Sequence, residues 1–331
     1  MKTYSLKLKQ KSGLLTELQS DTIYGHFCWR LKEKLGEDKL VEFISSYKND
    51  KPVFLVSDGL LSVGGEIHFP RPFIFNKPEL KEKKADKVVE FVKRKKIKER
   101  NYLNVSEMNS FLSNGIIKLE EKKEETSKKK KHKSEIPLRT ESLRVSVQID
   151  RNTFGSSEGK LFSFNPKYNR NDVSYVLLIK VLDENNFKLF ECENILREVF
   201  SVGFGRKKSS GYGQFEVDEK TPFVEFNEII EPKDANALMV LGNYLPSDSD
   251  NVDAVGYEIN TKYGKLGEEL SQSENPFKNP IVFLTAGSCF NTEIKKDFYG
   301  RVTNNGEVSK TKDFVVQFGI PFIIKFNFNH L

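Results

Sequence analysis

The residues with the clearest chemical potential form one continuous run, Gly203-Phe204-Gly205-Arg206-Lys207-Lys208-Ser209-Ser210-Gly211-Tyr212-Gly213. Glycines can take positive φ values and let the backbone approach another group closely. Three cations and two hydroxyl groups lie between the glycines, and no carboxylate interrupts them. Free backbone N–H groups together with guanidinium, ammonium and hydroxyl donors suit phosphate oxygens. The run therefore predicts a phosphate site, and the backbone of a nucleic acid is the ligand that it suits best.

The glycine-rich run departs from both common nucleotide-binding motifs. Gly211 is followed by Tyr212 rather than by the Lys-Ser/Thr pair of a Walker A loop, and Lys208 stands where the dinucleotide fingerprint has its third glycine. The run also follows a predicted helix instead of opening one, which argues against a nucleotide hydrolase. The competing structural interpretation is a helix C-terminus with a solvated basic tail, although cap geometry needs one glycine rather than four.

A second candidate is His26, which lies in a helix predicted to begin with Ser20-Asp21 as an N-cap and to end at Gly36. The imidazole could be a general acid or base in metal-independent RNA cleavage, a contact to RNA, or a half-buried structural group. No second histidine is near it in the sequence, which favours a structural or binding role. For Asp21, a capping role is favoured over a catalytic one.

The third candidate is a protruding β-hairpin over 143–164. Apolar residues alternate with polar ones over 143–149, a polar loop follows, and a short apolar run resumes at 161–164. The polar side of this hairpin includes Arg144, Arg151 and Lys160. Phe154 is at the predicted tip, where an aromatic ring can stack on an unpaired base.

The remaining pattern places these candidates on an α+β scaffold. Strands are predicted at 4–8, 53–56, 173–182 and 215–217, helices at 20–36, 81–100 and 195–202, and a turn-rich presented loop at 64–72. The order helix, glycine-rich loop, strand is the closing half of a ferredoxin-like β-α-β-β-α-β unit. Residues 118–135 are low in complexity and nearly free of apolar side chains, which predicts a mobile insertion.

A domain boundary is predicted near Pro222. Beyond it, strand candidates at 237–241, 281–284 and 314–318, the last running on through 324, indicate a second domain of mixed strands and helices. A chain of 331 residues suits two domains of roughly 100–200 residues each.

Bulk composition limits the partners and cofactors. Lys and Arg number 53 against 47 for Asp and Glu, a formal charge of +6 that permits an anionic partner without requiring one. Cys28, Cys192 and Cys289 form no CxxC pair and the histidines are isolated, so we expect no disulfide framework, metal or cofactor. No signal peptide or membrane-spanning run is visible, which predicts a soluble, cytoplasmic protein.

These residues also resemble a known family. The segment Ser20–Trp29 resembles the first-helix signature of the RAMP superfamily of CRISPR effector proteins, and Gly203–Gly213 resembles its defining glycine-rich loop. Stretches at 149–153, 159–162, 262–267, 275–278, 287–288 and 319–322 narrow the resemblance to the family of fourth subunits of the Csm complex, the type III-A interference effector. The resemblance covers most of the chain outside about 75–135.

The resemblance implies a noncatalytic subunit with two ferredoxin-like (RRM-like) domains, here 1–220 and 221–331. Such subunits bind the single-stranded, repeat-derived 5′ handle of the guide RNA and dock the large polymerase/cyclase-like subunit onto the backbone RAMP subunits, with no membrane or small-molecule substrate. It implies that 203–213 holds the handle, that 143–164 is a thumb-like hairpin kinking the guide, and that Ser20 and His26 contact RNA.

Two other functions stay open at this point. One is a guide-processing endoribonuclease of the same superfamily that uses His26. The other is an assembly protein whose basic loop docks on an acidic partner surface. RNA binding is favoured over both, with Arg206, Lys207 and Lys208 on phosphates, Ser209 and Ser210 donating to phosphates or base edges, and the glycines allowing close approach.

Overall fold

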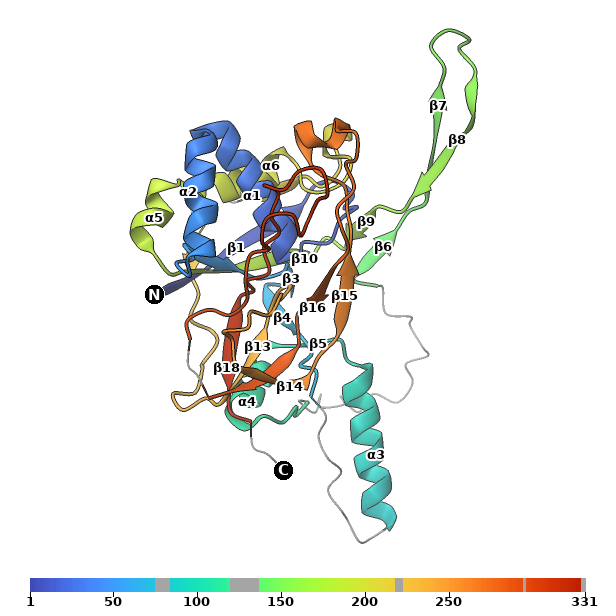
Figure 1. The fold of residues 1–331 in the computed structure, drawn as a ribbon. Coiled ribbons are helices and arrows are strands. Elements are labelled where there is room, and N and C mark those ends of the chain that lie inside the picture. The colour runs from blue at the N-terminus through green and yellow to red at the C-terminus, as the bar shows by residue number, and fades with distance from the viewer. Residues whose placement is uncertain (75–83, 120–136, 218–222, 294–295, 329–331) are drawn as a thin grey trace.

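The computed structural model describes residues 1–74, 84–119, 137–217, 223–293 and 296–328 as a mixed α/β protein (Figure 1). The expected mobile insertion at 118–135 lies almost entirely outside the described residues, as does the expected boundary at 220/221. None of the helices in the described residues combines the length and the apolar character needed to cross a bilayer.

The first sheet is built around two long neighbouring strands, β1 (Lys2–Gln10) and β10 (Val173–Val181), which pair antiparallel. β10 is buried along nearly its whole length, as its apolar run predicts for a central strand. Beside β1 lie β11 (Phe215–Val217) and β12 (Phe223–Glu225); beside β10 lie β2 (Phe54–Val56) and β3 (Leu60–Val63), followed by β4 (Glu66–Pro70) and β5 (Tyr102–Leu103). The predicted strands of this half are therefore confirmed.

A group of helices lies together on one side of the molecule: α1 (Ser20–Leu35), α2 (Glu37–Lys48), α5 (Glu184–Leu189) and α6 (Cys192–Val202) (Figure 1). The predicted stripe of Ile23, Phe27 and Leu31 is buried in the core, and Gly36 ends α1 with φ +91°. The N-cap prediction is wrong, because Gln19 takes that position without a side-chain cap bond. Ser20 and Asp21 lie inside the first turn.

Residues 139–169 form a long arm that projects from the body (Figure 1). Its stem pairs β6 (Arg139–Glu141) with β9 (Lys167–Asn169), and its outer part pairs β7 (Arg144–Ile149) with β8 (Ser156–Phe164). The predicted protruding hairpin is confirmed. Helix α3 (Lys84–Glu99) fits the predicted charged helix, and α4 (Val105–Asn114) begins with an Asn104–Glu107 capping box.

The stretch 64–72 does not form a presented loop. Only its start is a turn, and it continues as β4 because Ile67 and Phe69 alternate into the core beside β3. The glycines and prolines of this stretch indicate turns, so its short period-two pattern was not recognised from the sequence.

The second half contains a smaller sheet with β13 (Ala237–Val240) between β17 (Cys289–Thr292) and β18 (Ile323–Phe326). Strand β14 (Val252–Gly256) pairs with β17, and β15 (Ile259–Lys262) pairs with β16 (Ile281–Leu284) as a separate hairpin. Described residues 223–293 and 296–328 contain a short 3₁₀ turn, η2 (Glu268–Gln272), but no α-helix, so the helices expected in this half are not found there.

The strand expected at 314–318 is wrong over that range, whereas its expected continuation through 324 is confirmed in part by β18. This segment is irregular and leaves Phe314 exposed, whereas the ring of Phe318 stacks on Tyr24 of α1 with a centroid distance of 4.6 Å. Packing of one aromatic side chain against the helices thus replaces strand pairing.

The two sheets share one strand order. Counted along the chain, the first half lies in the order fourth, first, third, second as β11-β1-β10-β3, and the second half repeats that order as β18-β13-β17-β14. α1, α2 and α6 occupy connections of the first sheet, while irregular segments occupy the matching connections of the second. The halves are joined by one continuous hydrophobic core that includes Leu6, Phe27, Met239 and Phe326.

Candidate nucleic-acid interface

The glycine-rich loop (residues 203–213) connects α6 to β11 and is closed on itself by backbone hydrogen bonds. The N–H of Phe204 donates to the carbonyl oxygen of Gly213 at 2.8 Å, and the N–H of Gly213 donates to that of Gly13 at 2.9 Å. Gly213 has φ +70°, and a Cβ there would lie 2.0 Å from the Phe204 carbonyl oxygen. Glycine is therefore required at this crossing for both conformation and space.

His26 supports this loop from α1. Its Nε2 accepts a hydrogen bond from the N–H of Gly205 at 3.0 Å, and its ring contacts that of Phe204 with centroids 4.7 Å apart. Burial, together with the charge of Lys208, lowers the pKa of His26 to about 4. The imidazole is therefore neutral near pH 7, with the nitrogen that would accept a proton already used as an acceptor.

Most backbone amides of the loop are not free, contrary to the sequence-based expectation. The N–H of Arg206 donates to Thr16 Oγ1 at 3.0 Å, and further amides donate to acceptors of the protein itself: those of Phe204, Gly205, Ser210, Gly211, Tyr212 and Gly213. Gly203 and Gly213 are buried, whereas Arg206, Ser209, Ser210 and Gly211 are exposed. The loop thus presents side chains rather than a nest of amides.

Lys207 links the glycine-rich loop to the arm. Its Nζ lies 4.6 Å from the ring centroid of Phe162 and 4.4 Å from that of Phe164, within cation–π range. The ring of Tyr212 meets Phe164 edge-on, with centroids 5.5 Å apart. The structure therefore joins two candidates that the sequence placed forty residues apart into one surface.

Lys208 has a carboxylate partner that the sequence analysis did not predict. Its Nζ forms an ion pair with Glu268 of η2, in the other half of the chain. A phosphate bound by Lys208 must compete with that carboxylate. Arg206 is different, because its exposed guanidinium has no side-chain partner among the described residues. Arg206 is therefore the loop cation that is most available to an anion.

The outer arm carries its candidate residues in the open. Arg144, Arg151 and Lys160 are exposed, and Phe154 at the tip exposes 85% of its surface with φ +55°. An exposed apolar face accompanies them, formed by Leu143, Val145, Val147, Ile149 and Leu161. The arm thus combines cations with apolar and aromatic surface that the protein itself leaves uncovered.

The stem of the arm is fixed to the loop that precedes α1. Glu17 accepts hydrogen bonds from Lys167 Nζ at 2.6 Å and from Arg139 at 3.3 Å. Burial raises the pKa of Glu17, but these two cations outweigh burial and hold the pKa below its usual value. Leu14 adds a backbone bridge to Lys167, so the stem has a defined direction.

Ser20 does not lie on this surface, which corrects the expectation of a contact with RNA. It exposes 1% of its surface, and its hydroxyl accepts the N–H of Asn243 at 2.9 Å. Its own N–H donates to Asp58 at 2.7 Å. Burial raises the pKa of Asp58 to about 7 despite that bond, and the nearby Asp21 also raises it. The first turn of α1 therefore holds the two halves together.

Asp21 is the centre of that junction. Its carboxylate accepts from Lys262 Nζ and Asn243 Nδ2, each at 2.7 Å, and from Gln317 Nε2 at 2.8 Å. The partners lie 222 to 296 residues away along the chain, so no local pattern could have indicated them.

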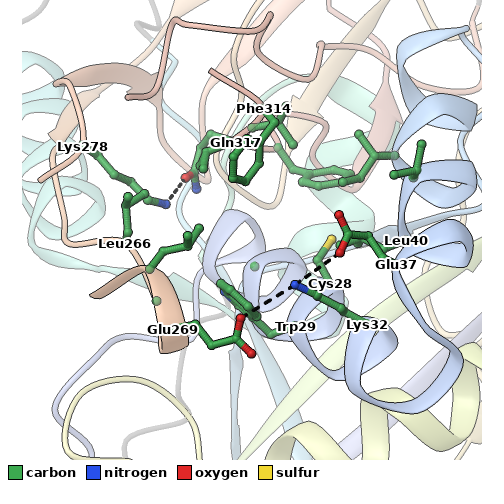
Figure 2. Close-up of a pocket in the computed structure, with 18 of the residues that line it drawn as sticks. Cys28, Trp29, Lys32, Glu37, Leu40, Leu266, Glu269, Lys278, Phe314 and Gln317 are labelled. Atoms are coloured by element: carbon green, nitrogen blue, oxygen red, sulfur yellow. Dashed lines mark hydrogen bonds and ion pairs between the residues drawn. The ribbon is translucent and has the colours of Figure 1, made fainter. Parts of the chain in front are cut away.

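A cavity of about 300 Å³ lies beside η2, the short turn that contacts Lys208 of the glycine-rich loop. It is enclosed by α1, α2 and the segments 266–270 and 314–318 (Figure 2). Trp29 and Phe314 are among its walls, and Lys278 and Gln317 meet at one end. The sequence analysis did not find this cavity. Among the described residues, no group of three His, Cys, Asp or Glu side chains is placed to hold a metal ion.

Comparison with known proteins gives a consistent result. No protein-family model matches the chain. A curated relative, the "CRISPR system Cms protein Csm4" of Streptococcus thermophilus, is 28% identical over 117 residues, covering 34% of this chain and 38% of the relative. A structure of the Csm3-Csm4 subcomplex in the type III-A CRISPR-Cas interference complex contains a similar chain, with a TM-score of 0.62 at 19% identity over 99% of this chain and 100% of that one.

This chain has a Csm4-like fold. A structure of the Csm1-Csm4 cassette in complex with cA4 contains a chain that matches with a TM-score of 0.61 at 15% identity, covering 100% of both chains. The resemblance to the fourth Csm subunit that the sequence indicated is therefore confirmed. The curated match spans only about two fifths of its relative, and the structural matches show that the Csm4-like fold extends over the whole chain.

Proposed function

We propose that this Csm4-like chain is a noncatalytic RNA-binding subunit of a type III-A CRISPR interference complex that holds the repeat-derived 5′ handle of the guide RNA. The observation that carries the proposal is the contact of Lys207 with Phe162 and Phe164. This contact makes the exposed side of the glycine-rich loop continuous with the arm. Cations, hydroxyl groups and aromatic rings then share one surface, as single-stranded RNA binding requires.

Within this surface the glycine-rich loop would bind phosphates through side chains. Arg206 offers a planar, permanently charged donor, and Ser209 and Ser210 offer hydroxyl groups beside it. The internal hydrogen bonds of the loop backbone hold those side chains in place. Lys208 would add a further cation when it exchanges Glu268 for phosphate.

The arm would act as the thumb-like hairpin expected from the family. Phe154 at its tip and the cations Arg144, Arg151 and Lys160 are exposed, so the arm can contact an RNA strand beyond the handle. The shared strand order of the two sheets supports the proposal that both halves derive from ferredoxin-like units, with the helices of the second replaced by irregular segments.

Protein partners of this chain are proposed from its relatives. Structures of similar chains are described as a Csm1-Csm4 cassette and a Csm3-Csm4 subcomplex. We expect this chain likewise to dock a large polymerase/cyclase-like subunit and a backbone RAMP subunit.

The decisive experiment measures fluorescence anisotropy of guide RNA with a native and a scrambled handle over a series of salt concentrations. Gel analysis of the recovered RNA accompanies it. Preference for the native handle with intact RNA is the expected result. Equal, salt-sensitive binding of both strands would show that the isolated chain contacts phosphates only.

The same experiment tests the two rivals. Cleavage of the RNA without metal, abolished in His26→Ala, would establish the endoribonuclease; the use of His26 Nε2 as an acceptor for Gly205 argues against that outcome. Failure to bind any RNA, with complex formation that survives ribonuclease treatment, would establish the assembly protein instead.

A further inference from the structure

The cavity beside η2 has the walls of a site for a flat ring. Trp29 of α1 forms one wall. The backbone of Gly267 packs closely against the indole of Trp29, because a Cβ at Gly267 would lie only 2.9 Å from Trp29 Nε1. Leu40, Ile44 and Phe314 supply further apolar surface. Ligand sites are commonly concave, mostly apolar cavities of roughly 300–1,000 Å³ with a few polar groups at fixed positions. A cavity of about 300 Å³ suits one ring system rather than a chain.

The polar end of the cavity offers hydrogen-bond donors. Lys278 Nζ donates to Gln317 Oε1 at 2.7 Å (Figure 2). The amide of Gln317 donates in turn to Asp21. An ammonium group has three N–H donors, so this bond uses only part of the capacity of Lys278. Burial lowers the pKa of Lys278, and the charge of Asp21 partly offsets that effect. A ligand with carbonyl or ring-nitrogen acceptors would satisfy the remaining donors.

The mouth of the cavity selects against an anion. Lys32 lies between Glu37, at 3.6 Å, and Glu269, at 3.9 Å (Figure 2). Two carboxylates against one ammonium oppose a phosphate inside the cavity, but they tolerate a neutral ring whose phosphate stays outside on the glycine-rich loop. These exposed ion pairs are weak and can open readily.

The cavity lies next to the proposed RNA surface. Glu268 of η2 binds Lys208 of the glycine-rich loop, and its neighbour Glu269 lines the mouth of the cavity. Consecutive Cα atoms are about 3.8 Å apart. The residue that contacts the glycine-rich loop and the residue that lines the cavity are therefore direct neighbours in η2. A strand whose phosphates rest on the loop therefore runs close to this opening.

From these observations we infer that the cavity receives one unstacked nucleobase of the bound RNA, which stacks on Trp29 and accepts hydrogen bonds from Lys278 at its edge. The inference rests on the proposed function and adds a base-specific site to it. An apolar side chain of a partner protein could also fill the cavity. Unlike a nucleobase, it would leave the remaining N–H donors of Lys278 without acceptors.

The chain reports on this site by itself, because Trp29 is its single tryptophan. We would titrate the full-length protein with an unlabelled repeat-derived RNA, and with the same strand carrying one abasic position at a time, while recording Trp29 emission. Anisotropy of a labelled strand gives the affinity in parallel. The change in Trp29 emission should have the same midpoint as the anisotropy change. An abasic site at one particular position of the RNA should abolish the emission change.

Variants then block the cavity. Gly25 lines it from α1, and nothing lies within 4 Å of where its Cβ would be, so Gly25→Leu fills the space in a helix that favours leucine over glycine. Phe314→Ala removes an exposed wall with little risk to folding. Each should weaken RNA binding roughly 5- to 150-fold, the effect of losing one base–aromatic stack. Phe277→Ala is the matched control, being similarly exposed but outside the cavity.

The outcomes separate this inference from the proposed function. Handle binding with unchanged affinity in Gly25→Leu and Phe314→Ala, and no response of Trp29, would overturn the base site and leave the proposed function intact. No RNA binding by the wild-type protein would remove both. A response of Trp29 to a partner subunit but not to RNA would assign the cavity to a protein side chain and overturn the inference.

Discussion

The Nζ atom of Lys207 lies 4.4 Å from the centre of the Phe164 ring, and this contact ties the glycine-rich loop to the base of the arm. A lysine between two aromatic rings keeps its charge at the surface while its position is fixed. Lys207 therefore places a loop cation directly against the aromatic rings at the base of the arm, which makes the loop cations the first target for mutation.

We expect Arg206→Ala combined with Lys207→Ala to reduce the salt dependence of RNA binding by roughly one to two units of slope, since two phosphate contacts are lost. Lys188→Ala, an exposed cation on α5, is the matched control and should leave the slope unchanged. Binding isotherms at several salt concentrations give the slopes. An unaltered slope in the double variant would refute the assignment of the loop.

The glycines of the loop should differ sharply in tolerance. Gly211→Ala meets no atom within 4 Å, so only its φ of +84° opposes the change, at a cost of about 1–2 kcal/mol. Gly213→Ala adds a collision at 2.0 Å with the Phe204 carbonyl oxygen and should destabilise by clearly more. Urea denaturation of both variants measures the difference; equal stabilities would contradict the described crossing.

His26 should make stability depend on pH. Its pKa is about 4 in the fold and near 6.5 when unfolded, so between these values the unfolded chain binds a proton that the folded chain does not. Stability should therefore fall on acidification from pH 6.5 towards 4, by on the order of 3 kcal/mol from this residue. Melting curves across that range measure the fall.

The matched variant His26→Gln can still accept a hydrogen bond but does not titrate. It should reduce the acid-dependent loss, while His68→Gln, which keeps His26, should retain it. An identical pH profile for wild type and His26→Gln would mean that the imidazole is not held neutral beneath the loop.

The junction around Asp21 should control stability rather than RNA contact. Lys262→Met removes the ammonium 2.7 Å from the Asp21 carboxylate and leaves a buried charge with amide donors only. We expect a loss of about 2 kcal/mol, below the loss for a fully buried pair because Lys262 is partly exposed. Adding Asp21→Asn should recover part of it, as measured by a double-mutant cycle. Additive losses would show that the two side chains do not interact.

Much of this protein was determined locally by its sequence. Alternation over 4–8 and 143–149 reports a period of two, and the Ile23-Phe27-Leu31 stripe reports a period of about 3.6. The continuous apolar run at 173–182 indicates a strand buried on both faces, and each of these patterns formed the expected element. The glycine-rich loop was found for the same reason, because its residue types act within a short stretch of chain.

The tertiary structure alone decided which partners those residues meet. Lys208 finds Glu268 sixty residues away, Asp21 finds Lys262 and Gln317 at separations of 241 and 296, and the cavity closes between helices and segments from opposite ends of the chain. Sequence periodicity describes which face of an element is apolar, but not which distant element covers it. Pairing of charges and enclosure of space depend on that second choice, and so they become visible only when the two halves pack on their shared core.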